Sequence, residues 1–280
     1  MFVEEFRPSS TAQRVAMKRA AHQLLDDPLA LHMVGKEHAS ALRADPRQFE
    51  ATALSSYLRA FVAARSRYAE DELALGVRRG VCQYVILGAG LDTFAYRNPH
   101  PHGVLHVFEV DHPTTQTWKR ARLKEAGITL PNNLTFAPVD FETQTLAERL
   151  VGAGYDSGKC TFFSWLGVTE YLTTEAVMTT LRFIASAPVE SGVVFDYVLS
   201  PSLLTPVQRS RFDAIAQRVA SAGEPWKTFF DPGLLAMDLR AMGFEYSEDN
   251  GPEEINARYF DGRKDGLRVG SLSHIMNARV

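Results

Sequence analysis

One stretch decides the fold of this chain: Tyr84-Val85-Ile86-Leu87-Gly88-Ala89-Gly90-Leu91-Asp92-Thr93. It begins with apolar residues, as does a strand that is buried on both faces of a parallel sheet. Gly88 and Gly90 follow at once, and glycine lets a backbone turn sharply and approach a ligand closely because it has no Cβ atom. The next apolar run, 104–110, ends with the acids Glu109 and Asp111. A glycine turn after one strand and an acid at the end of the next are typical of a pocket for a ribose-bearing ligand.

Beyond this turn the sequence alternates between strand and helix patterns. Apolar runs predict strands at 83–88, 104–110, 134–139, 160–166 and 192–198, and helical spacing predicts helices at 113–126, 143–152 and 174–186. Because the strands are almost continuously apolar, both faces of the sheet are expected to be covered. Later runs at 244–247 and 267–275 predict the last strands. The predicted fold class is therefore α/β, with a mostly parallel, seven-stranded Rossmann-like sheet and helices on both faces.

The flanking segments extend this core without forming separate domains. Residues 1–78 carry helical patterns and are expected to form N-terminal helical additions, and residues 79–200 hold the strand–helix core. Residues 201–235 contain a helical stretch and a loop dense in aromatic side chains, which we predict to be a lid-like insertion over the ligand. The C-terminal strands fall within 236–280. The whole chain, 1–280, is predicted to be a single domain.

The composition excludes several classes of protein. The chain has 280 residues, of which 45% are hydrophobic and 22% charged, and its formal net charge is −3. Nucleic acid is not expected as the main partner, because basic residues are not in excess. No apolar run reaches the ~18 residues that a membrane-spanning helix needs, and the N-terminus lacks the features of a signal peptide. The expected location is the cytoplasm, with Cys82 and Cys160 reduced.

The position after the turn narrows the choice of ligand. A dinucleotide fingerprint places a third glycine where the helix opens, so that backbone amides reach a pyrophosphate. Here that position is Thr93, and no lysine follows the glycines as it does in a P-loop. A nicotinamide-dependent oxidoreductase stays open as an alternative but is disfavoured. A ligand with a ribose and no phosphate fits better, and S-adenosylmethionine is such a ligand.

The sequence offers a residue for each part of S-adenosylmethionine. A glycine turn suits the methionine part, an acid the ribose hydroxyls, a carboxylate beside an aromatic ring the adenine, and a cation the methionine carboxylate. The residues that meet these needs are Gly88 and Gly90, Asp111 with Glu109 behind it, Asp140 with Phe141, and Arg65 on the helix before the first strand. Each has a plainer interpretation when taken alone, since an aspartate also caps helices. Their order along the chain favours the cofactor site.

Motifs around these residues resemble the signatures of the leucine carboxyl methyltransferase-like family, in particular its bacterial branch. They are VILGAGLDTFAYR at 85–97, FEVDHP at 108–113, WLGVTEYL at 165–172 and ARSRYAED at 64–71. The resemblance covers nearly the whole chain and implies a class I S-adenosylmethionine-dependent methyltransferase. The cofactor contacts that it implies are Arg65 at the methionine carboxylate, Gly88 at the methionine side, Asp111 at the ribose and Asp140 with Phe141 at the adenine, and the matching motifs add Gly90, Asp92, Glu109 and Trp165 as candidates.

The chain departs from the family at one position. In the eukaryotic members that act on protein phosphatases, a glutamate that contacts the cofactor precedes the Gly-Val of the fourth-strand motif, whereas here that position is Leu166. This departure disfavours a protein-phosphatase tail as the substrate. The best-known reaction of the family is on a carboxylate, and some bacterial relatives methylate small natural products. The resemblance therefore implies an O-methyltransferase for a carboxylate, phenol or other hydroxyl of a small molecule, such as a polyketide-type natural product.

Candidates on the acceptor side are mainly aromatic. Rings near the carboxyl edge of the sheet can hold a planar acceptor. Those that fit, with one arginine, are Tyr171, Tyr197, Trp226, Phe229, Phe230, Arg258 and Tyr259. A carboxylate acceptor needs no base at neutral pH, whereas a phenol profits from one, and His112 and Tyr171 are the catalytic candidates. No metal site is expected, because the histidines at 100, 102, 106 and 112 lack accompanying carboxylates. A non-catalytic protein that keeps the cofactor pocket stays open as a further alternative.

Overall fold

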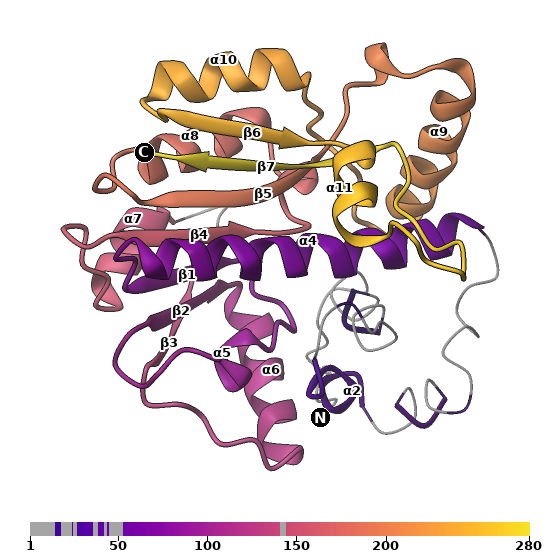
Figure 1. The fold of residues 1–280 in the computed structure, drawn as a ribbon. Coiled ribbons are helices and arrows are strands. Elements are labelled where there is room, and N and C mark those ends of the chain that lie inside the picture. The colour runs from indigo at the N-terminus through magenta and orange to yellow at the C-terminus, as the bar shows by residue number, and fades with distance from the viewer. Residues whose placement is uncertain are drawn as a thin grey trace.

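The structure is a computed structural model that describes residues 15–17, 24, 27–35, 39–41, 44, 53–140 and 144–280, without the side chains of residues 53–55. Helices flank one central sheet (Figure 1). Within the N-terminal helical additions predicted over residues 1–78, Val15, Ala16 and Met17 are helical, Leu24 is not, and much of the segment before residue 53 lies outside the described residues. No helix within the described ranges is long and apolar enough to span a membrane.

The sheet has seven strands in the order β3-β2-β1-β4-β5-β7-β6. The strands are β1 (Gln83–Leu87), β2 (His106–Asp111), β3 (Leu134–Pro138), β4 (Thr161–Trp165), β5 (Gly192–Val198), β6 (Tyr246–Asn250) and β7 (Ser273–Arg279). β1 to β5 are parallel, and β7 runs antiparallel to both β5 and β6. The predicted mostly parallel, seven-stranded Rossmann-like sheet is confirmed. The strand order reverses between β1 and β4, and such a switch point is where open α/β sheets bind ligands.

Helices cover both faces of the sheet (Figure 1). The core on one face includes side chains of α4 (Ala53–Arg78), α5 (Phe94–Arg97) and α11 (Pro252–Tyr259). The core on the other face includes side chains of α7 (Leu146–Gly152), α8 (Thr174–Ala185) and α10 (Pro232–Met242). The short helix α2 (Ala30–Met33) contacts α6 (Pro113–Glu125). The sheet is therefore the middle of three layers.

The strand β1 shows why these sequences form a covered sheet. Successive side chains of a strand point to opposite faces. Val85 and Leu87 belong to the core with α7 and α8, whereas Tyr84 and Ile86 belong to the core with α4. All positions of β1 are buried. An unbroken apolar run is thus required here, because neither face of the strand meets water.

The last part of the chain differs most from the sequence prediction. β6 and β7 begin and end later than predicted, and the helix α11 between them was not predicted. β6 carries Glu248 and Asp249 and is exposed over most of its length, so it lacks the apolar pattern of a buried strand. Charged side chains are common on such edge strands because they discourage pairing with another chain. Pro252 at the first turn of α11 marks its start.

The segment after β5 leaves the sheet and returns to it. It contains the turn η2 (Pro201–Leu203) and the helix α9 (Pro206–Ser221), which begins at a capping box formed by Thr205 and Gln208. The chain then comes back along residues 222–230, and Phe230 pairs with Leu199 at the end of β5. The returning loop therefore lies at the carboxyl edge of the sheet.

Candidate functional site

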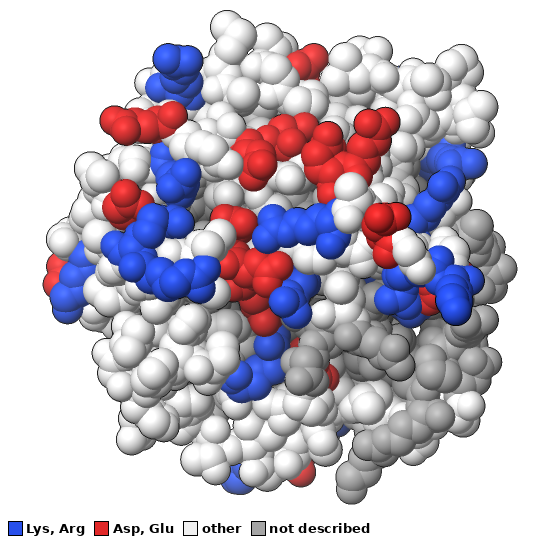
Figure 2. Space-filling model, in the orientation of Figure 1, with Lys and Arg blue, Asp and Glu red and all other residues white. Residues whose placement is uncertain are grey.

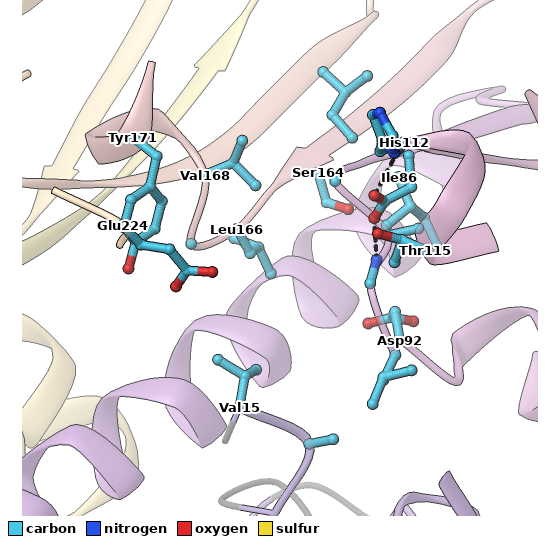
Figure 3. A pocket seen from close by; sticks show the side chains of 18 of the residues that line it. Val15, Ile86, Asp92, His112, Thr115, Ser164, Leu166, Val168, Tyr171 and Glu224 are labelled. Atoms are coloured by element: carbon cyan, nitrogen blue, oxygen red, sulfur yellow. Dashed lines mark hydrogen bonds between the residues drawn. The ribbon is translucent and has the colours of Figure 1, made fainter. Parts of the chain in front are cut away.

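A cavity of about 430 Å³ opens at the carboxyl ends of β1, β2 and β4. Its walls come from the glycine turn, the segment after β4, the helix α4 and the loop 223–227, with Val15 and Ala16 from the N-terminal segment. His112, Thr115 and Asp92 lie at one end of it, and Tyr171 and Glu224 lie at the other (Figure 3). Its volume is in the range that small-molecule sites occupy.

The glycine turn forms one wall of the cavity. Gly88 has φ +67°, and a Cβ atom placed on it would lie 2.4 Å from Cγ2 of Val168. Gly90 also has a positive φ, +44°. These backbone conformations favour glycine. The turn thus brings bare backbone to the cavity wall, as a closely held ligand requires.

Asp111 holds the turn from the end of β2. One carboxylate oxygen accepts a hydrogen bond from the Gly90 amide, and the other accepts one from the His112 amide (Figure 3). Burial raises the pKa of Asp111, while these two amide hydrogen bonds oppose the shift. Because Asp111 also lines the cavity, its carboxylate is placed to accept hydrogen bonds from the hydroxyls of a ligand.

Glu109 lies behind this carboxylate and does not line the cavity. Its side chain is fully buried and forms an ion pair of 2.6 Å with Nζ of Lys119, which is also buried. The Tyr96 hydroxyl donates to the same carboxylate. Burial raises the pKa of Glu109 to about 7, although the Lys119 ammonium lowers it. The partner comes from α6, so the sequence around Glu109 alone gave no signal for it.

Arg65, on α4, lines the cavity at the end away from Asp111. Its Nη1 is 2.6 Å from Oδ2 of Asp196, and both side chains are buried. The other carboxylate oxygen of Asp196 accepts a hydrogen bond from the Gly167 amide. Gly167 has φ +72°, and a Cβ atom there would lie 2.4 Å from Nη2 of Arg65. Among the described residues the Nε of Arg65 has no hydrogen-bond partner, so the guanidinium retains donor capacity.

Two further side chains at this end come from the turn η1 (Thr169–Tyr171) after β4. Tyr171 lines the cavity, and burial followed by the charge of Glu170 raises its pKa to about 12. Glu170 is 8% exposed and lies behind the wall. Its carbonyl accepts hydrogen bonds from the amides of Lys227 and Thr228. The turn η1 therefore joins the cavity to the returning loop.

The remaining cofactor candidates lie at different distances from the cavity. Asp92 lines it and caps the amide of Phe94. Asp140 is half-buried and does not line the cavity, and Phe141 lies outside the described residues. The side chain of Trp165 is fully buried in the core on the α8 side of the sheet, and its Nε1 has no hydrogen-bond partner among the described residues.

The acceptor candidates other than Tyr171 pack in small groups outside the lining of the cavity. The Tyr197 hydroxyl donates to Asp249, and Tyr197 also packs edge-on against Phe230. Trp226 and Phe229 pack around Phe212 of α9. The guanidinium of Arg258 lies over the rings of Tyr68 and Tyr259, and the Tyr259 hydroxyl donates to Asp71. None of these candidates is among the described residues that line the cavity.

His112 lies at the Asp111 end of the cavity, away from Tyr171 (Figure 3). Its Nδ1 accepts a hydrogen bond from the Thr114 amide, which makes His112 the N-cap of α6. Over the part of the chain that is described, no three His, Cys, Asp or Glu side chains are grouped so as to hold a metal ion.

On the face shown in Figure 2, basic and acidic side chains are interleaved.

Sequence reasoning missed several residues of the cavity and the groups behind it. Ser66 is on α4, Ser164 is in β4, and Glu224 and Lys227 are in the returning loop. Asp196 reaches Arg65 from β5. An acid in an otherwise apolar strand was the available signal for Asp196, because a buried charge needs a partner. The loop residues carried no comparable signal.

Comparisons with known proteins agree with this geometry. The family model described as leucine carboxyl methyltransferase matches residues 9–185. YktD of Bacillus subtilis, provisionally named an S-adenosyl-L-methionine-dependent methyltransferase, is 36% identical over 244 residues, which are 87% of this chain and 80% of YktD. A Mycolicibacterium smegmatis protein with the same provisional name is 31% identical over 228 residues, which are 77% of this chain and 71% of that protein.

Solved structures show the same fold at low sequence identity. A crystal structure from Thermobifida fusca, provisionally titled a methyltransferase, has a TM-score of 0.58 and 16% identity, and the match covers 99% of this chain and 96% of that one. A DUF574 family protein from Streptomyces avermitilis has a TM-score of 0.56 and 14% identity, with 98% of each chain covered.

Proposed function

Because the chain belongs to the leucine carboxyl methyltransferase family and is an S-adenosylmethionine-dependent methyltransferase, we propose that its cavity binds this cofactor between Asp111 and Arg65. We further propose that the methyl acceptor is an oxygen of a small molecule, in the first place a carboxylate. One observation carries the proposal: Asp111 and Arg65 line the same cavity at the switch point of the sheet. The proposed cofactor has a ribose diol and an α-carboxylate, which match these two side chains.

The described residues fit the cofactor in shape as well as in charge. Gly88 and Gly90 keep the wall between the two ends free of side chains. Arg65 pairs with Asp196 and packs against the bare backbone of Gly167, yet its Nε has no hydrogen-bond partner within the described part of the chain. In the proposed arrangement the Asp111 carboxylate accepts hydrogen bonds from the ribose hydroxyls, and the Arg65 guanidinium pairs with the methionine carboxylate. Asp92, which also lines the cavity, stays a candidate for a further contact.

The cofactor supplies a methyl group on a positively charged sulfur. The task of the protein is to align an acceptor oxygen behind that group and to exclude water, and orientation alone supplies much of the rate in such a displacement. Val168 and Tyr171 line the end of the cavity near Arg65, and the loop 223–227 lies over that end. We propose that this loop and the helix α9 act as the lid that orients the acceptor.

The position of the possible bases supports a carboxylate acceptor. A carboxylate is ionised at neutral pH and needs no base, whereas a phenol with a pKa near ~10 profits from one. His112 lies at the Asp111 end of the cavity and caps α6, away from Tyr171 (Figure 3). Tyr171 has a raised pKa of about 12, so it suits hydrogen-bond donation to an acceptor oxygen better than proton removal.

Calorimetric titration with S-adenosylhomocysteine tests the cofactor assignment. The wild-type protein is expected to bind one equivalent, and Asp111→Ala is expected to weaken binding by at least about tenfold, which is ~1.4 kcal/mol. Asp238→Ala, at an exposed aspartate on α10, whose residues do not line the cavity, is the matched control and should bind like the wild type. Equal affinity in all three proteins would contradict the role of Asp111. Release of S-adenosylhomocysteine during turnover with a panel of small carboxylic acids and phenols then tests the acceptor class.

A further inference from the structure

A buried group of charged side chains lies behind the Arg65 end of the cavity. Arg65 of α4 pairs with Asp196 of β5 at 2.6 Å. Glu170 lies in the turn η1, which packs against β5, and its side chain is buried, with no hydrogen-bond partner for Oε2 among the described residues. Its carboxyl is close enough to Asp196 and Arg65 to interact with both charges. The group therefore contains two carboxyl groups and one guanidinium, all shielded from water.

The other elements around Glu170 add no second buried cation within the described residues. Thr169, from the same turn, donates its hydroxyl to the carbonyl of Asp196. Burial, followed by the charges of Glu170 and Glu224, raises the pKa of Tyr171, the next residue. The returning loop approaches through the amides of Lys227 and Thr228, which bind the Glu170 carbonyl, and the Lys227 side chain is exposed. Arg65 is therefore the buried cation of this group, whereas the exposed Lys227 lines the cavity from the loop.

The charge of this group decides whether Arg65 can receive an anion. With Asp196 ionised and Glu170 neutral, the group has no net charge, and a ligand carboxylate next to Arg65 is attracted by the guanidinium. With Glu170 also ionised, the group carries a net negative charge. Glu170 then competes for Arg65 and repels the ligand, and such repulsion is strong because burial lowers the effective dielectric constant.

We propose that Glu170 is a positioning residue for the methionine end of the cofactor, and that it must carry its proton for Arg65 to receive the cofactor carboxylate. This inference rests on the proposed function, because it takes the carboxylate at Arg65 as given. Above the pH at which Glu170 ionises, cofactor binding takes up one proton from solvent, and that proton stays on the Glu170 carboxyl. The residue does not line the cavity, so it acts through Arg65.

The electrostatics agree with a neutral Glu170 in the free protein. Burial and the charge of Asp196 raise the pKa of Glu170 to about 8, although Arg65 lowers it. The same residue holds the returning loop through its carbonyl. Glu170 thus connects the proposed carboxylate site with the proposed lid.

Titration with S-adenosylhomocysteine between pH 6 and pH 9.5 tests the proposal. In the wild type, the dissociation constant is expected to be level at low pH and to rise by up to about tenfold per unit above pH 8. Glu170→Gln, a neutral mimic of the protonated side chain, is expected to bind with a smaller rise. The amino group of the ligand titrates equally with both proteins, so the difference between the two curves reports Glu170. 5′-Methylthioadenosine, which lacks the carboxylate and the amino group, should show no such difference.

A second measurement uses the wild type alone, in case the variant does not fold. Binding heats at pH 8 in buffers of different ionisation enthalpy should show uptake of about half a proton with S-adenosylhomocysteine and close to none with 5′-methylthioadenosine. Parallel pH curves for wild type and Glu170→Gln, or equal proton uptake with both ligands, would overturn the role of Glu170 and leave the cofactor site intact. If neither ligand binds at any pH, the proposed function fails and this inference fails with it.

Discussion

Gly88 forms part of the cavity wall and adopts a backbone conformation that favours glycine. Alanine there requires a left-handed conformation and places Cβ 2.4 Å from Cγ2 of Val168. We expect Gly88→Ala to lower the free energy of unfolding by about 1–3 kcal/mol, measured by urea denaturation. Gly80→Ala is the control, because it has φ +108° but no atom within 4 Å of the added Cβ. Adding Val168→Ala should recover part of the loss, and no recovery would show that the contact with Val168 is not its cause.

Lys119 neutralises a carboxylate that has no access to water. Lys119→Met leaves Glu109 buried without its cation, and breaking a buried pair in this way costs about 3–5 kcal/mol. In the unfolded variant Glu109 ionises near pH 4.5, its ordinary value, whereas in the folded variant it keeps its proton. The loss should therefore be larger at pH 8 than at pH 5 in urea denaturation. The double variant Lys119→Met with Glu109→Gln should regain stability, and a loss independent of pH would contradict the ion pair.

Single residues differ in how far the sequence reveals their roles. The motifs predicted Arg65, Gly88, Gly90, Asp92 and Asp111, and the fold brings all of them to one cavity. Thr93, at the position of a third glycine, donates its hydroxyl to Asp27 of the N-terminal segment. Such partners lie far away in the sequence, so local patterns do not indicate them. Asp196 was not predicted as the partner of Arg65 for the same reason, because the two residues lie far apart in the sequence.

The returning loop 222–230 is the element that we expect to respond to the cofactor. It is tied to η1 through the Glu170 carbonyl, and the Thr228 hydroxyl donates to the Leu172 carbonyl. Hydrogen exchange of peptides covering this loop should slow when S-adenosylhomocysteine binds, because local opening would then also cost binding free energy. Peptides of α10, whose residues do not line the cavity, serve as the control. Unchanged exchange in the loop would contradict its role as a lid.

Elements were predictable where burial imposes a pattern. β1 to β5 were located to within a few residues. β1, β4 and β5 are buried at every position, so their apolar runs are nearly continuous, whereas β3 is an edge strand with only Ala137 buried. β6 has one exposed edge and acidic side chains, and α11 is short, so neither produces a strong periodic pattern. The Tyr171 end of the cavity depends on the loop after α9, whose course follows from tertiary contacts.

For the whole molecule, buried acids set the dependence of stability on pH. In the unfolded chain Glu170 ionises near pH 4.5, whereas in the folded chain it keeps its proton up to about pH 8. The folded state binds more protons across this interval, so this residue makes the free energy of unfolding fall as pH rises from 4.5 to 8. Glu170→Gln should be more stable than the wild type by at least about 1 kcal/mol at pH 8.5 and by little at pH 4.5. Urea denaturation at both pH values checks this, and an equal difference at both would contradict a neutral Glu170.

At the scale of the whole cavity, we propose that one ligand connects Asp111 with Arg65 across the glycine turn. A crystal structure with bound S-adenosylhomocysteine tests it most directly. We predict the ribose hydroxyls within hydrogen-bonding distance of the Asp111 carboxylate, and the ligand carboxylate at the guanidinium of Arg65. A ligand bound in the reverse direction, or bound outside this cavity, would contradict the claim.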